Sequence, residues 1–137
     1  MPSKIAWLIE NHVLLVTFEG IITQEEFEEF VVQTLIFLKK ADYPVVHQII
    51  DATKISTLPD NNILLCASSI KQAGIGWSVI ISNGNTVLRT RVNAINRQMN
   101  IRYRYVITME DATRLLKKLD TSLEELTFRH PSDSTDD

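Results

Sequence analysis

The stretch Tyr43–Thr108 reads YPVVHQIIDATKISTLPDNNILLCASSIKQAGIGWSVIISNGNTVLRTRVNAINRQMNIRYRYVIT, and it decides the fold of this chain. Three apolar runs within it, Val45–Asp51, Trp77–Ser82 and Ile101–Thr108, are typical of buried strands. The two stretches between these runs are each long enough for one helix. Strands that alternate with helices indicate parallel βα units, so the sequence predicts a parallel sheet here.

The residues before Tyr43 predict a hairpin and one helix. Lys4–Glu10 alternates in polarity, and Val13–Phe18 is apolar on both faces, which indicates two antiparallel strands joined by a tight turn. Thr23 and Glu26 have the spacing of a capping box, and apolar residues then recur at helical spacing. We therefore expect a helix that packs on the sheet.

Three more helices are expected, over roughly Pro59–Ala73, over about Thr86–Met99, and after the capping residue Thr108. The predicted order is β-β-α-β-α-β-α-β-α. This order defines an α/β protein with a single mixed five-stranded sheet, an N-terminal hairpin and then parallel βα units. One domain is expected over residues 1–128. Residues 129–137 form an acidic tail with no core to join, and we expect it to be disordered.

The composition is that of a globular protein of one domain. The chain has 137 residues, of which 45% are hydrophobic and 23% charged. No apolar stretch approaches the roughly 20 residues that span a bilayer. The N-terminus lacks the long apolar segment of a secretory signal, and the single cysteine, Cys66, cannot form an intrachain disulfide. A cytoplasmic location is therefore expected.

Charge is segregated along the chain, although the net charge is only −3. Residues 1–83 carry −4, residues 84–118 carry +6 and residues 119–137 carry −5. The basic block could meet phosphates or an acidic partner, or it could be balanced by the acids of the chain itself. Arg102 and Arg104 on the last strand would also discourage edge-to-edge pairing. Nucleic acid is not expected as a partner, because only this block is basic and the tail repels phosphate.

The sequence does not predict an enzyme. Cys66, His47 and Asp51 are the only conceivable triad. His47 and Asp51 lie four residues apart on one strand, which places them about 13 Å apart. No spacing matches a zinc or calcium site. Gly74 and Gly76 are expected to stop the helix predicted over Pro59–Ala73, and this segment precedes a strand, whereas a dinucleotide fingerprint follows one. We expect no catalytic residues, no cofactor and no metal.

A candidate binding surface is the crevice outside the carboxyl ends of the parallel strands, where open α/β sheets bind ligands. Polar residues follow two predicted strands at this edge. They are Ser56, Thr57, Asp60, Asn61, Asn62, Asn83, Gly84, Asn85, Thr86 and Arg89. The helix starts here offer free amides that could hold an anion, with Arg89 assisting. The other interpretation is that these residues only cap helices and form turns.

Several segments resemble the STAS domains, typified by bacterial anti-sigma factor antagonists, and in particular an uncharacterised SpoIIAA-like branch related in fold to the CRAL-TRIO lipid carriers. Val45–Asp51 resembles the central strand, and Ile55-Ser-Thr-Leu resembles the loop that leads into the second helix. Trp77–Asn83 looks like the fourth strand with its exit turn, and Arg102–Leu119 looks like the end of the family's domain. The resemblance implies a non-enzymatic regulatory domain of bacterial signalling that acts through a protein partner.

One motif of the antagonists is missing. They carry a phosphorylated serine in an Asp-Ser-Ser/Thr-Gly motif, whereas this chain has Pro59-Asp60-Asn61-Asn62, and Asn61 cannot accept phosphate. Three hypotheses therefore stay open. The first is a protein-interaction domain, with a homodimer suggested by a half-polar face of the sheet and by the strand that carries Tyr103 and Tyr105. The second is a small-ligand or lipid-binding module of the CRAL-TRIO kind. The third is a phospho-switch at Ser56 or Thr57.

Overall fold

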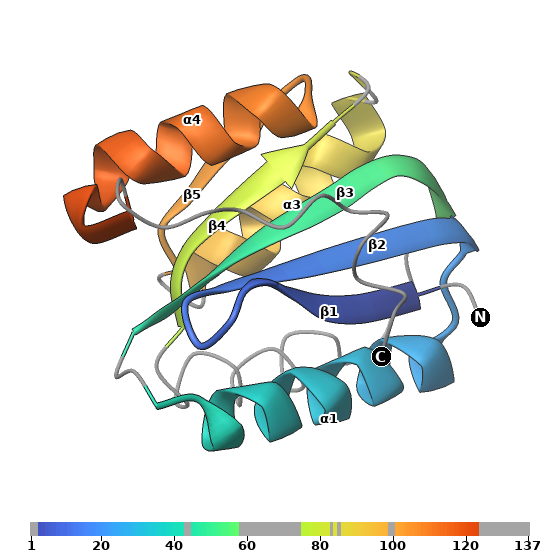
Figure 1. Cartoon of the computed structure of the whole chain (residues 1–137). Coiled ribbons are helices and arrows are strands. Elements are labelled where there is room, and N and C mark those ends of the chain that lie inside the picture. The colour runs from blue at the N-terminus through green and yellow to red at the C-terminus, as the bar shows by residue number, and fades with distance from the viewer. Residues whose placement is uncertain are drawn as a thin grey trace.

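The computed structural model describes residues 3–42, 45–57, 75–82, 84, 86–98 and 101–123. Its centre is a five-stranded sheet whose strands lie side by side in the order of the sequence (Figure 1). The strands are β1 (Ser3–Ile9), β2 (Val13–Ile21), β3 (Val46–Thr57), β4 (Ile75–Ile81) and β5 (Tyr103–Val106). β1 is antiparallel to β2, and every later pair is parallel. The predicted mixed sheet with its N-terminal hairpin is confirmed.

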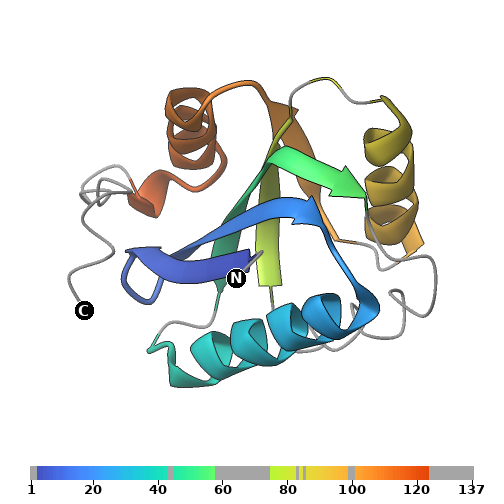
Figure 2. The same cartoon turned by 90° about the vertical axis from the view of Figure 1, so that its right-hand side faces the viewer.

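Within the described residues, three helices cover the two faces of this sheet. Helices α1 (Gln24–Lys40) and α3 (Thr86–Gln98) lie against one face, and α4 (Met109–Leu119) lies against the other, followed by the short 3-10 helix η1 (Thr121–Leu123) (Figure 2). The helix predicted over Pro59–Ala73 and the tail 129–137 lie outside the described residues. Among the helices that the structure describes, none combines the length and hydropathy that a bilayer crossing requires.

The core has one layer on each face of the sheet. Phe18, Phe30 and Ile80 pack between the sheet and α1, and Phe18 meets Phe30 edge to face with ring centroids 5.0 Å apart. On the other face, Val79 and the α4 residue Leu116 belong to the second cluster. Since β3 and β4 are apolar on both faces, they have the near-continuous hydrophobic pattern of strands covered on both sides.

The predicted helix caps are present. Thr23 Oγ1 accepts a hydrogen bond of 3.2 Å from the Glu26 amide, and the Glu26 carboxylate accepts one of 3.4 Å from the Thr23 amide. Thr108 caps α4, since its hydroxyl accepts from the Asp111 amide at 3.1 Å. These bonds satisfy amides of the first helical turn that have no intrahelical partner.

β2 and β3 continue beyond the predicted limits at their carboxyl ends. β3 includes Ser56 and Thr57, which the sequence placed in a loop, because the end of β2 pairs with this segment, Gly20 with Ile55 and Ile21 with Thr57, across an irregular register. This half of β3 follows Asp51, the last residue that pairs with β4, and its polar side chains are mostly exposed. The polar composition of this segment therefore predicted a turn, whereas the segment is a strand that pairs with β2.

The ring of His47 ties the amino ends of two strands to the end of α4. This buried ring accepts a hydrogen bond at Nδ1 from the Trp77 amide at 2.9 Å, and its Nε2 lies 2.9 Å from Asp120 Oδ2. An acceptor at Nδ1 requires the proton on Nε2, so His47 donates to Asp120. Gly76, predicted as a helix stop, lies inside β4 and makes room for the ring, because a Cβ there would be 2.5 Å from His47 Nδ1.

We expect Gly76→Ala to lower the free energy of unfolding by about 1–3 kcal/mol, because the added methyl group overpacks the His47 ring. The measurement is urea unfolding of the single variants and of the pair with His47→Ala. Removing the ring removes the two closest contacts, at 2.5 and 2.8 Å, and leaves the one to Val45 Cγ1 at 2.9 Å, so alanine at position 76 should be less destabilising in the His47→Ala background. An equal loss in both backgrounds would contradict this account.

Candidate functional site

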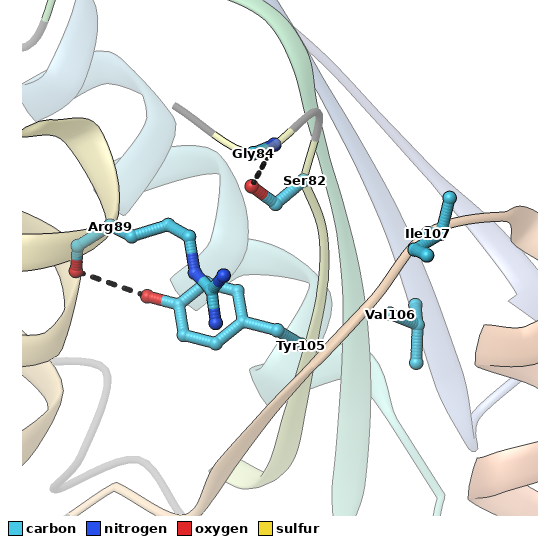
Figure 3. Close-up of a pocket in the computed structure, with 6 residues that line it drawn as sticks. All are labelled: Ser82, Gly84, Arg89, Tyr105, Val106 and Ile107. Carbon is cyan, nitrogen blue, oxygen red and sulfur yellow. Dashed lines mark hydrogen bonds between the residues drawn. The ribbon is translucent and has the colours of Figure 1, made fainter. Parts of the chain in front are cut away.

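A cavity of about 370 Å³ opens where β4 and β5 end and α3 begins. It is lined by Ser82, Gly84, Arg89, Tyr105, Val106 and Ile107 (Figure 3). The cavity therefore lies at the carboxyl ends of parallel strands, the edge at which the sequence placed a binding crevice. Its volume is within the range of small-molecule sites, which is about 300–1,000 Å³.

Arg89 and Tyr105 form the polar side of the cavity. The Arg89 Cζ atom lies 4.2 Å from the centroid of the Tyr105 ring, so the cation rests on the π face of the ring. The Tyr105 hydroxyl lies 3.2 Å from the Arg89 carbonyl oxygen (Figure 3). It also donates a hydrogen bond of 2.7 Å to Asn93 Oδ1. The ring and the hydroxyl of Tyr105 are thus both held by residues of α3, and the exposed residue Arg89 lines the cavity.

Burial raises the pKa of the Tyr105 hydroxyl above its ordinary value of 10.0, and nearby Tyr103 adds to that rise. Arg89 acts in the opposite direction, through its charge and a hydrogen bond, but burial is the larger effect. At neutral pH the hydroxyl therefore keeps its proton and acts as a donor. Arg89 supplies the positive charge of the cavity.

Ser82 and Gly84 shape the turn above the cavity. The Gly84 amide donates to Ser82 Oγ at 3.2 Å, and Gly84 has a φ of 91°, in the left-handed region that favours glycine. Ser82 was not among the residues predicted for the site, because it ends an apolar strand run. Val106 and Ile107 were also missed. Ile107 is 78% exposed, and in sequence it reads as one more strand residue.

The structure brings only part of the predicted site together. Gly84 and Arg89 line the cavity, and Thr86 begins α3 beside them. Ser56 and Thr57 end β3, exposed, and do not line the cavity. Five predicted residues lie outside the described part of the chain. They are Asp60, Asn61, Asn62, Asn83 and Asn85.

Of the three residues considered for catalysis, His47 and Asp51 form structural bonds, and Cys66 lies outside the described residues. Both ring nitrogens of His47 have partners, as described above, and Asp51 accepts bonds from the Thr53 amide and hydroxyl at 3.1 and 2.7 Å. Hydrogen bonds, first from Ser122 and then from His47, lower the pKa of Asp120 below its ordinary value. Within the described ranges, no three His, Cys, Asp or Glu side chains gather in a way that could hold a metal ion.

The topology defines an α/β domain with a SpoIIAA-like fold, as the sequence predicted. One similar solved structure is an uncharacterised protein of the DUF3478 family with a SpoIIAA-like fold from Shewanella loihica. It has a TM-score of 0.62 and 16% identity, over 83% of this chain and 93% of that one. The anti-sigma factor antagonist SpoIIAA in its unphosphorylated form has a TM-score of 0.59 and 10% identity, over 84% and 97%. No protein-family model and no curated protein matches the sequence.

We expect Tyr105→Phe to lower the free energy of unfolding by about 0.5–1.5 kcal/mol at neutral pH, because Asn93 loses its donor. This difference should narrow as pH rises past 10.0, the value for the unfolded state. A hydroxyl whose folded-state pKa is raised stabilises the protein below the unfolded value and loses that effect as pH rises through the folded one. Urea unfolding of the wild type and the variant, from neutral pH to above 10.0, measures this difference in the free energy of unfolding. A difference that does not change with pH would contradict the raised pKa of Tyr105.

Proposed function

We propose that this chain is a non-enzymatic regulatory domain of the STAS type, and that it binds a partner protein at the rim formed by the ends of β4 and β5. The fold supports this proposal, since one protein that shares it is an anti-sigma factor antagonist, whose name describes action on another protein. Fold alone does not specify function, so the proposal depends on the site.

The observation that carries the proposal is Ile107, which is 78% exposed beside a cavity that also presents Arg89. An exposed isoleucine next to a concave surface gives a partner an apolar contact and a place for one of its own side chains. The guanidinium of Arg89 suits a carboxylate at the edge of that contact. We therefore expect the partner segment to combine an apolar side chain with an acidic one.

The absence of catalysis is part of this proposal. A general base needs a free nitrogen within reach of a substrate, but Nδ1 of His47 accepts from the Trp77 amide and Nε2 faces Asp120. His47 is also only 3% exposed. These contacts support a structural role for His47.

A small-molecule ligand is the second candidate, and the volume of the cavity, about 370 Å³, favours it. Arg89 would select an anionic compound. Native mass spectrometry of the purified protein tests this candidate, since a bound compound of defined mass would be retained by the wild type and lost from Arg89→Gln. The phospho-switch at Ser56 or Thr57 and the lipid-carrier hypothesis stay predictions.

The homodimer also stays a prediction, but its original basis has changed. Tyr103 and Tyr105 meet edge to face with centroids 5.9 Å apart, and the Tyr105 hydroxyl is bonded to α3. These rings pack beneath a helix and do not form a free dimer surface. Light scattering at high concentration measures the oligomeric state directly.

We expect Ile107→Glu to weaken partner binding more than tenfold, because burial of an isoleucine side chain contributes about 1.5–3 kcal/mol. The measurement is quantitative affinity capture from the source cells, with the wild type and the variant as baits. Val32→Glu is the matched control, since Val32 is 48% exposed on α1, away from the cavity. The proposed binding rim is supported if the wild type and Val32→Glu retain a protein that Ile107→Glu loses. Equal capture by all three baits would overturn it.

A further inference from the structure

Two arginines and one tryptophan form a second cluster, on the face of the sheet opposite Arg89. The Cζ atoms of Arg102 and Arg104 lie 4.9 and 4.8 Å from the centroid of the Trp77 ring. Since Ser78 pairs with Tyr103, Trp77 is the neighbour of Arg102 across the two strands and lies diagonal to Arg104. The side chains of Arg102 and Arg104 are exposed. We call these three residues the Arg–Trp cluster.

The cluster is fixed in place before any ligand binds. The Trp77 amide donates to the buried His47 ring, which holds the backbone beneath the indole. Arg104 Nη1 donates to the Tyr103 carbonyl oxygen at 3.0 Å. Each guanidinium also rests on the indole, an attraction worth more for tryptophan than for other rings. Little side-chain freedom is therefore left to lose on binding.

Among the described residues, the acids nearest the end of the sheet do not balance the positive charge of the cluster. Asp111 pairs with Arg114 at 3.2 Å, and Asp120 bonds to His47 and Ser122. Within the described part of the chain, no carboxylate forms an ion pair with Arg102 or Arg104. Two like charges beside one ring repel each other, and an anion would remove that repulsion.

We propose that the Arg–Trp cluster binds a phosphate monoester group. Each arginine side chain carries five N–H donors, of which one on Arg104 is engaged by the Tyr103 carbonyl oxygen, so donors remain for phosphate oxygens, and the fork of an arginine matches phosphate geometry. A phosphate monoester carries about −1.5 to −2 charges at neutral pH, which matches two guanidinium groups. A single carboxylate would neutralise only one of them.

The test is an NMR titration of the full chain with inorganic phosphate and with a phosphoserine peptide, followed at the indole N–H of Trp77 and the Nε–H of the arginines. We expect saturable shifts at Trp77, Arg102 and Arg104. In the double variant Arg102→Gln/Arg104→Gln, affinity should fall about tenfold or more, because charge-assisted hydrogen bonds are lost.

One single variant is the matched control. Arg97→Gln removes an exposed arginine of α3 and should bind phosphate as the wild type does. Equal weakening in Arg97→Gln and in the double variant, or no saturable shift at Trp77, would overturn the proposal. If the peptide and inorganic phosphate bind equally, the ligand is a free phosphorylated compound, whereas tighter binding of the peptide indicates a phosphorylated protein.

Discussion

The arrangement of this protein depends on β3, which lies at the centre of the sheet and pairs in parallel with both neighbours. Parallel neighbours cannot be joined by tight turns, so the chain must cross over the sheet between them. The crossings through α1 and α3 cover one face, α4 covers the other face after β5, and β2 to β5 all end at one edge. The cavity with Arg89 lies at that edge because β4 and β5 end there and α3 begins there.

His47 fastens this arrangement at the opposite edge. Its ring is bonded to β4 through the Trp77 amide and to the residue after α4 through Asp120, which is 73 positions away in sequence. Because both nitrogens have partners, burial leaves no polar atom of the ring unsatisfied. The space for the ring exists because residue 76 is a glycine. A histidine beside a carboxylate is a common catalytic pair, but the two bonds of the His47 ring connect separate parts of the fold.

The features predicted correctly from sequence are those governed by local patterns. Hydrophobic runs fixed the strands, and the spacing of Thr23 and Glu26 fixed the start of α1. The features that were missed depend on residues distant in sequence. Gly76 reads as a helix stop until the His47 ring is placed against it, and Ser56 reads as a loop residue until the end of β2 pairs with that segment. Arg89 and Gly84 were found by the general rule for strand ends, whereas Ser82 and Ile107 were hidden inside strand-like runs.

The alternation along β5 separates two kinds of surface. Tyr103 and Tyr105 face α3 and close the core, while Arg102 and Arg104 face the side of α4. One structural explanation for the arginines is protection of the sheet edge, and the bond from Arg104 to the Tyr103 carbonyl fits it, since it occupies an edge acceptor. That explanation needs one arginine only. It does not account for a second guanidinium held on the same indole, where repulsion between the two opposes the arrangement. A ligand with two negative charges accounts for both arginines.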